Sequence, residues 1–199
     1  MENKLPKSFY TRNVLTVAKE LLGKVIIKKN SSELLSGRIV EVEAYDGEKD
    51  KAAHSYHGIS NRNKIMFDDG GKLYVYLSYG VHYCCNVVTG NKGKGSAVLI
   101  RAVEPINGIE RMIENRFSKK LVKDSELYKL TNGPGKVCSA FDISLDHYGI
   151  NLTGNTIFLI DSSLRKSEKI GKSERIGISK STELQWRFFI KDNPYLSRK

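Results

Sequence analysis

Two glutamates in a hydrophobic stretch are the residues of this sequence best suited to acid–base chemistry. Residues 37–45, GRIVEVEAY, alternate apolar side chains with Glu41 and Glu43 and lead directly into a long polar segment. A solvated strand face is one interpretation of this alternation. A carboxylate at a strand end beside a functional loop is also well placed to be a general base, which is the second interpretation. The residues alone leave both open.

A positive charge interrupts a second hydrophobic stretch, at Arg101 in AVLIRAV. An arginine buried without a partner is strongly unfavourable, so Arg101 must pair with an acid. A salt bridge to Glu41 or Glu104 would be structural. A contact across a site with Glu43 would hold that carboxylate ionised and would be functional.

The polar segment 46–71 is long for a connection in a compact domain, which makes it a candidate functional loop. It contains His54, in AAHSYHG, followed by His57. A lone loop histidine is usually solvated, but the two alanines before His54 indicate close packing of the backbone there. The segment lacks the His-x-Glu and Cys-x-x-Cys patterns of zinc deaminases, and we expect no bound metal.

We expect no organic cofactor either. The sequence GPGK at 133–136 resembles a phosphate-binding turn at a helix start, but it lacks the Gly-Lys-Ser/Thr ending of a nucleotide-binding loop. Cys84 and Cys85 are adjacent and Cys138 is distant, which matches neither a disulfide framework nor a zinc site. The three cysteines are therefore expected to be small apolar residues.

Residues 74–86, YVYLSYGVHYCCN, read as two strands that meet at a turn. Tyr74 and Tyr76 share one strand face, and their hydroxyls, with Asn86 on the returning strand, favour a partly polar cleft over a plain core. Tyr79 lies at the turn, where it has no sheet to pack on. It resembles the apolar and aromatic wedges that proteins insert between base pairs, which suggests a base taken out of its stack.

The turn must have an odd number of residues if both Tyr76 and Asn86 face the cleft, because paired strand residues then share the same parity. A two-residue turn would send Asn86 to the opposite face. We therefore predict a three-residue loop, residues 79–81, with Ser78 opposite His82 and the Tyr79 ring at the apex.

The elements that must position these residues form an α+β fold. The patterns predict a mixed, largely antiparallel sheet with surrounding helices and one protruding hairpin, in one domain over residues 1–199. Helices are predicted at 11–22, at 108–117 and just after 133, and strands are predicted at 24–29, 37–45, 74–78, 82–86, 96–105, 156–161, 174–179 and 186–190.

The charge points to a polyanionic partner. The 199 residues include 33 basic and 22 acidic ones, a net charge of +11, concentrated in KVIIKK, RFSKKLVK and LRKSEKIGKSER. Such a charge can serve solubility alone, but nucleic acid is the commonest partner of so basic a domain. No stretch is apolar enough to cross a membrane and the start is no secretory signal, so we expect a protein of the cytoplasm, nucleoid-associated in a bacterium.

Six segments together resemble the alkyladenine, or 3-methyladenine, DNA glycosylase family of bacteria and mammals. They are GRIVEVEAY, AAHS, NRN..MF, LYVYLSYGVHYCCNV, VLIRAVEP and GPGKVCSAF, in family order within a match that runs from about residue 9 to residue 190. The resemblance implies a monofunctional base-excision-repair enzyme that flips an alkylated or deaminated purine out of duplex DNA and hydrolyses its N-glycosidic bond. It implies damaged double-stranded DNA as the partner, and we expect a monomer.

The resemblance also implies the roles of individual residues. Glu43 would activate the water that attacks the sugar C1′. Arg101 and the backbone near Ile176 would help to hold that water.

The remaining matched residues would bind the DNA. Tyr45, His54 and Tyr76 would wall the pocket around the flipped base, with a hydrogen bond from His54. Asn86 would clash with the exocyclic amine of guanine and so exclude normal purines. Tyr79 would intercalate and fill the gap left in the duplex.

Two other classes of function compete with this one. A non-catalytic nucleic-acid binder that stacks bases on Tyr74, Tyr76 and Tyr79 fits the charge and the aromatics equally well. It leaves Glu43 unexplained, because a carboxylate in a basic cleft repels phosphate. A small-molecule hydrolase leaves both the net charge and Tyr79 unexplained.

Overall fold

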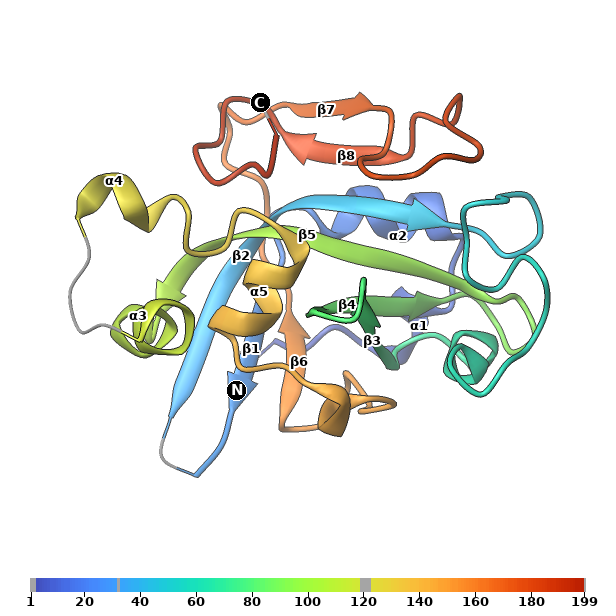
Figure 1. Ribbon diagram of the computed structural model, residues 1–199, viewed down its shortest axis with the longest axis horizontal. Coiled ribbons are helices and arrows are strands. Elements are labelled where there is room, and N and C mark those ends of the chain that lie inside the picture. Colours follow the sequence, from blue (N-terminus) through green and yellow to red (C-terminus); the bar gives the residue numbers. More distant parts are fainter. Residues whose placement is uncertain (1–2, 32, 119–122, 199) are drawn as a thin grey trace.

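The computed structural model describes residues 3–31, 33–118 and 123–198, which form an eight-stranded sheet with helices around it (Figure 1). The hydrogen-bonded order is β3-β4-β5-β2-β1-β6, and β8 pairs with both β2 and β7. Each pairing of named strands in the described residues is antiparallel, which confirms the predicted α+β class. The strands are β1 (Val25–Lys29), β2 (Leu34–Tyr45), β3 (Leu73–Ser78), β4 (His82–Thr89), β5 (Ser96–Asn107), β6 (Ile157–Ile160), β7 (Ile170–Ser173) and β8 (Arg187–Ile190).

The two longest strands, β2 and β5, lie side by side across the centre of the molecule (Figure 1). Val42 and Ile100 point into the main hydrophobic core and are fully buried. Glu43 and Leu99, the next residue pair in the register, point to the opposite side of the sheet. The first half of β2 pairs with β1, whereas residues 41–43 pair with β8 instead. The part of β2 that carries Glu41 and Glu43 therefore lies between β5 and β8.

The helices cover this sheet in short pieces. They are α1 (Lys7–Tyr10), α2 (Val14–Leu21), α3 (Ile109–Phe117), α4 (Asp124–Leu127) and α5 (Pro134–Ala140), with 3-10 turns η1 (Lys64–Phe67) and η2 (Leu145–His147). Helix α2 packs on β2 and β5, and α5 packs on β4 and β5. The helix predicted over 11–22 is shorter than expected because the Asn13 side chain caps it, accepting a hydrogen bond from Leu15 N at 2.9 Å.

The hairpin of β3 and β4 has the predicted register. Ser78 pairs with His82, so residues 79–81 form the loop, and Tyr74 and Tyr76 pair with Asn86 and Cys84. The Tyr79 side chain is 91% exposed at the apex. Tyr79 and Gly80 both adopt positive φ angles, 49° and 71°, which reverse the chain in this short loop.

The strand predicted at 174–179 is wrong. Strand β7 ends at Ser173, and the chain continues as a loop beside the end of β2. Each of the two hydrogen bonds from this loop to the end of β2 involves a side chain, in place of a backbone ladder. Arg175 donates to Ala44 O at 2.9 Å, and Ile176 N donates to the Glu43 carboxylate at 2.7 Å. Tertiary partners have therefore replaced the strand ladder that the alternating sequence favours.

Segment 46–71 is a loop, as predicted, with only the single turn η1 inside it. Its start is fixed by a fully buried ion pair between Asp50 and Arg175. The Arg175 guanidinium contacts both Asp50 oxygens, one of them from Nη2 at 2.8 Å, and Nη2 also reaches Ser181 O at 3.3 Å. One ion pair thus joins loop 46–71, the end of β2 and the 174–181 loop.

Within the described ranges, no helix is long and apolar enough to span a lipid bilayer. Of the predicted basic run at 116–123, residues 119–122 lie outside the described part of the chain.

We expect Asp50→Asn to lower the free energy of unfolding by about 3–5 kcal/mol, because it leaves the Arg175 charge buried without a counter-charge. Urea unfolding measures this loss. Glu20→Gln is the matched control, since it breaks the exposed Arg12–Glu20 pair and should cost less than about 1 kcal/mol. Equal stability of Asp50→Asn and the wild type would show that the buried pair does not anchor the two loops.

Candidate active site

A cleft of about 560 Å³ opens between the β3–β4 hairpin, the β2–β5 pair, loop 46–71 and the 174–181 loop. This volume is in the range of ordinary small-ligand sites. The lining includes seven of the eight residues to which the family resemblance gives a role, namely Tyr45, His54, Tyr76, Tyr79, Asn86, Arg101 and Ile176. The eighth, Glu43, is fully buried and contacts three of them.

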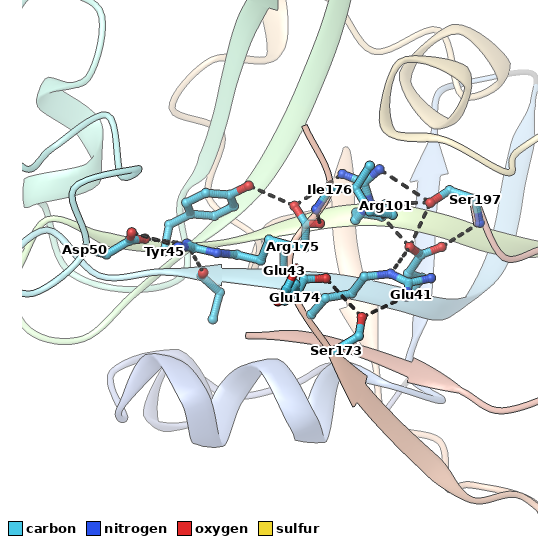
Figure 2. A network of polar contacts seen from close by, with 12 residues as sticks. Glu41, Glu43, Tyr45, Asp50, Arg101, Ser173, Glu174, Arg175, Ile176 and Ser197 are labelled. Carbon is cyan, nitrogen blue, oxygen red and sulfur yellow. Dashed lines mark hydrogen bonds and ion pairs between the residues drawn. The ribbon is translucent and has the colours of Figure 1, made fainter. Parts of the chain in front are cut away.

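Three donors converge on the Glu43 carboxylate (Figure 2). Tyr45 OH and Arg101 Nη1 donate to Oε2 at 2.8 and 3.2 Å, and Ile176 N donates to Oε1 at 2.7 Å. An ionised carboxylate only accepts hydrogen bonds, so this surrounding matches the charged form. Burial and the neighbouring Glu43 charge raise the pKa of Tyr45, which keeps its hydroxyl a donor.

Arg101 bridges the two glutamates of β2. Its Nε lies 3.3 Å from Glu41 Oε1, while Nη1 reaches Glu43. Arg101 therefore makes both the structural salt bridge considered with Glu41 and the functional contact considered with Glu43. Glu104, the third candidate partner, pairs instead with Arg38 and Arg165. Because Glu41 and Glu43 are both fully buried, the interpretation of their strand face as solvated is wrong.

One wall of the cleft is aromatic. His54 Nδ1 lies 2.9 Å from Tyr74 OH, and the His54 ring meets the Tyr76 ring edge-on with centroids 4.6 Å apart. Tyr74 and Tyr76 stack with centroids 5.4 Å apart. Burial, with help from the Arg62 charge, lowers the pKa of His54 to about 4. The histidine is therefore neutral near pH 7.

The side chain of Asn63, in the same loop 46–71, holds the backbone at His54. Asn63 Nδ2 donates to His54 O at 2.8 Å and to Gly58 O at 3.0 Å, and Asn63 is buried. Ala53, before the histidine, is also buried, as its small side chain indicated. The His54 ring therefore projects from a turn that hydrogen bonds of Asn63 hold in place.

Asn86 and Tyr79 lie at different depths in the cleft. Asn86 is 4% exposed and donates from Nδ2 to Tyr74 O at 3.1 Å, so its side chain is fixed. Tyr79 lies at the exposed rim. Cys84 also lines the cleft, and burial raises its pKa to about 11, which keeps it an unreactive thiol.

Sequence reasoning missed Arg175 and the rim lysines. The Arg175 guanidinium lies 4.6 Å from the centre of the Tyr45 ring and 5.6 Å from that of Trp186, so it supports the cleft wall from behind. Lys51 and Lys180 line the mouth together with Arg62. The net charge of the chain was the one signal for this basic rim. Nothing near Arg175 in the sequence points to Asp50, its partner 125 residues away.

Comparison with known proteins identifies the family of this chain. The family model described as methylpurine-DNA glycosylase matches residues 8–194. A relative from Alkaliphilus oremlandii is 48% identical over 202 residues, covering 98% of this chain and 100% of its own, and one from Clostridium novyi is 45% identical over 205 residues, covering 98% and 99%. Both carry the name "Putative 3-methyladenine DNA glycosylase". The family expected from the six sequence segments is confirmed, and the chain belongs to the methylpurine-DNA glycosylases.

Proposed function

We propose that this chain is a monofunctional DNA glycosylase that flips an alkylated or deaminated purine out of the duplex and hydrolyses its N-glycosidic bond. Membership of the family supports a repair enzyme for alkylated bases. One observation carries the mechanism: a fully buried Glu43 that accepts three hydrogen bonds from residues lining an aromatic cleft. We further propose that residues 1–199 act as one domain and a monomer, on nucleoid DNA in the cytoplasm.

In the proposed reaction, Glu43 takes a proton from water as the water oxygen attacks C1′ of the sugar. The bond between C1′ and the purine nitrogen breaks, and its electron pair leaves with the base. The products are the free base and an abasic sugar. A purine methylated at N3 or N7 is cationic and already a good leaving group, so the enzyme must supply mainly a base and orientation. Arg101, whose Nη1 contacts Glu43, and the backbone near Ile176 are suited to orient that water.

The aromatic wall suits a flat, electron-poor base. Tyr45 and Tyr76 offer ring faces to which a desolvated cation is attracted by up to about 2 kcal/mol. His54, neutral near pH 7, can offer a hydrogen bond without repelling a cationic purine. Asn86, fixed by its bond to Tyr74 O, would exclude the exocyclic amine of guanine by its bulk.

Outside the cleft, the hairpin tip and the rim are suited to the duplex. Tyr79 would fill the space left by the flipped base, and Lys51, Arg62 and Lys180 would bind phosphates around it. A non-catalytic binder needs the rim and the tyrosines but gains nothing from Glu43. The groups that contact Glu43, a phenol, a guanidinium and a backbone amide, include no amine nucleophile, which favours direct hydrolysis over imine chemistry.

We expect Glu43→Gln to slow base release by on the order of 10²–10⁴, because the amide cannot take the proton from water. Release of free base from alkylated DNA under single-turnover conditions measures the rate, and a gel-shift assay should show binding of damaged DNA at least as tight as that of the wild type. A near wild-type rate would remove Glu43 as the base and make Glu41 the next candidate.

Tyr79→Ser should weaken base flipping, most strongly where the target base is well paired, because nothing then fills the gap in the duplex. A fluorescent base analogue opposite thymine, and the same analogue in a mismatch, reports the flipping equilibrium. Tyr128→Ser, at a tyrosine that is 47% exposed and outside the cleft lining, is the control. An unchanged equilibrium in Tyr79→Ser would exclude the wedge role.

DNA binding should weaken steeply with salt, with a log–log slope of roughly −0.9 for each phosphate that the basic rim neutralises. Lys180→Gln should reduce the magnitude of this slope by about 1 if that lysine contacts a phosphate. Lys169→Gln, an exposed lysine away from the cleft lining, should leave the slope unchanged. A flat salt dependence of the wild type would mean that the net charge of +11 serves another purpose.

A further inference from the structure

Behind Glu43 lies a second buried carboxylate with a full set of partners (Figure 2). Glu41 is fully buried and accepts from Arg187 Nε at 2.7 Å and from Arg101 Nε at 3.3 Å. Ser197, after β8, donates to the same carboxylate from its backbone N at 2.6 Å and from Oγ at 2.7 Å. Glu41 therefore receives four hydrogen bonds from three segments that are distant in sequence.

Arg187 is held as firmly as Glu41. Its Nη1 donates to Ser173 Oγ at 2.9 Å and its Nη2 to Arg198 O at 2.6 Å. Its guanidinium also lies 4.4 Å from the centre of the Phe189 ring. In the described part of the chain, the Arg187 guanidinium thus donates to Glu41, Ser173 and Arg198, and not to Glu43.

These contacts leave one part of Arg101 directed at Glu43. Nε of Arg101 lies 3.3 Å from Glu41 Oε1 and 3.4 Å from Ser197 Oγ. Nη2 also lies 3.4 Å from Ser197 Oγ. Nη1 is the nitrogen that reaches Glu43. A guanidinium is planar and rigid, so fixing the Nε side fixes the direction of Nη1. Without Glu41, the same guanidinium could turn and pair with Glu43 alone.

The charges explain why both carboxylates are tolerated. Glu41 and Glu43 carry two negative charges, and Arg101 and Arg187 carry two positive ones, all on residues with no more than 7% exposure. Burying ion pairs is a poor way to gain stability compared with apolar packing. The ion pairs of Glu41 lie beside Glu43. They are better explained by the orientation that they give to Arg101 and by their effect on the charge of Glu43.

We propose that Glu41 is a positioning residue for the hydrolysis. With Arg187 and Ser197, it holds Arg101 so that Nη1 points at Glu43, and it balances the second arginine charge at the floor of the cleft. This inference rests on the proposed function, since it concerns the roles assigned there to Glu43 and Arg101.

Glu41→Gln should slow single-turnover base release by on the order of 10², as expected when a catalytic group is misdirected, with little change in the affinity for damaged DNA. It should also move the acid limb of the pH–rate profile to lower pH. The groups around the two carboxylates are Arg101 from β5, Arg187 from β8 and the Tyr45 hydroxyl. Glu41→Gln removes a negative charge that shares Arg101 with Glu43, so the Arg101 charge then acts on the Glu43 carboxylate alone.

Glu168→Gln is the matched control. It neutralises a partly buried glutamate that is paired with a buried arginine, Arg38, outside the cleft lining. It should lower the melting temperature without moving the rate or the acid limb. If Glu41 had only a structural role, Glu41→Gln would likewise lower the melting temperature and leave the rate and the acid limb unchanged. That outcome would overturn the inference.

Ser197→Ala keeps the test decisive if Glu41→Gln does not fold. It removes the hydroxyl that donates to Glu41 and accepts from Arg101, and it changes no charge. It should therefore slow base release several-fold and leave the acid limb in place. A wild-type rate in Ser197→Ala would then count against the inference. Glu43→Gln, assayed in parallel, distinguishes failure of the proposed function from failure of the inference about Glu41. Full activity of Glu43→Gln overturns the proposed function and the inference with it. Loss of activity in Glu43→Gln, with wild-type behaviour in Glu41→Gln and Ser197→Ala, overturns the inference alone.

Discussion

The burial of two carboxylates on one strand is the constraint on which the architecture of the cleft depends. Glu41 and Glu43 are both removed from solvent, and a buried charge requires partners. Neither β2 nor its hairpin neighbour supplies enough of them. The partners come from β5, from β8, from the loop after β7 and from Ser197, so satisfying two side chains brings four distant segments together. The floor of the cleft is the place where these segments meet.

The same constraint separates two electrostatic regions. At the floor, two guanidiniums match two carboxylates, whereas Lys51, Arg62 and Lys180 line the mouth. A polyanion is attracted to the mouth, and the balanced charges below do not attract phosphate further in. The arrangement therefore favours a phosphate backbone outside the cleft and an uncharged or cationic group within it.

Sequence patterns predicted those features of the cleft that depend on residues close together in the chain. Strand parity, with Tyr76 and Asn86 taken to face one cleft, predicted the Ser78–His82 pairing. The need to neutralise a buried arginine led to the contact between Arg101 and the β2 glutamates. The strand predicted at 174–179 failed because alternation describes a side-chain pattern, not the partner of each backbone amide. The amide of Ile176 binds a carboxylate that lies 133 residues earlier in the chain. Ser197 and the Asp50–Arg175 pair were missed for the same reason, since nothing near them in sequence marks their partners.

His54 shows how burial adapts one residue to the cleft as a whole. A histidine of ordinary pKa would be partly protonated near neutral pH and would add a positive charge to a wall that faces Arg62 and Arg101. Burial among Tyr74 and Tyr76, and the nearby Arg62 charge, lower the pKa of His54 to about 4. The ring then keeps both a donor and an acceptor nitrogen, and Tyr74 OH occupies one of them. In the proposed reaction a cationic purine would therefore meet a neutral histidine, which adds no further positive charge to those of Arg62 and Arg101.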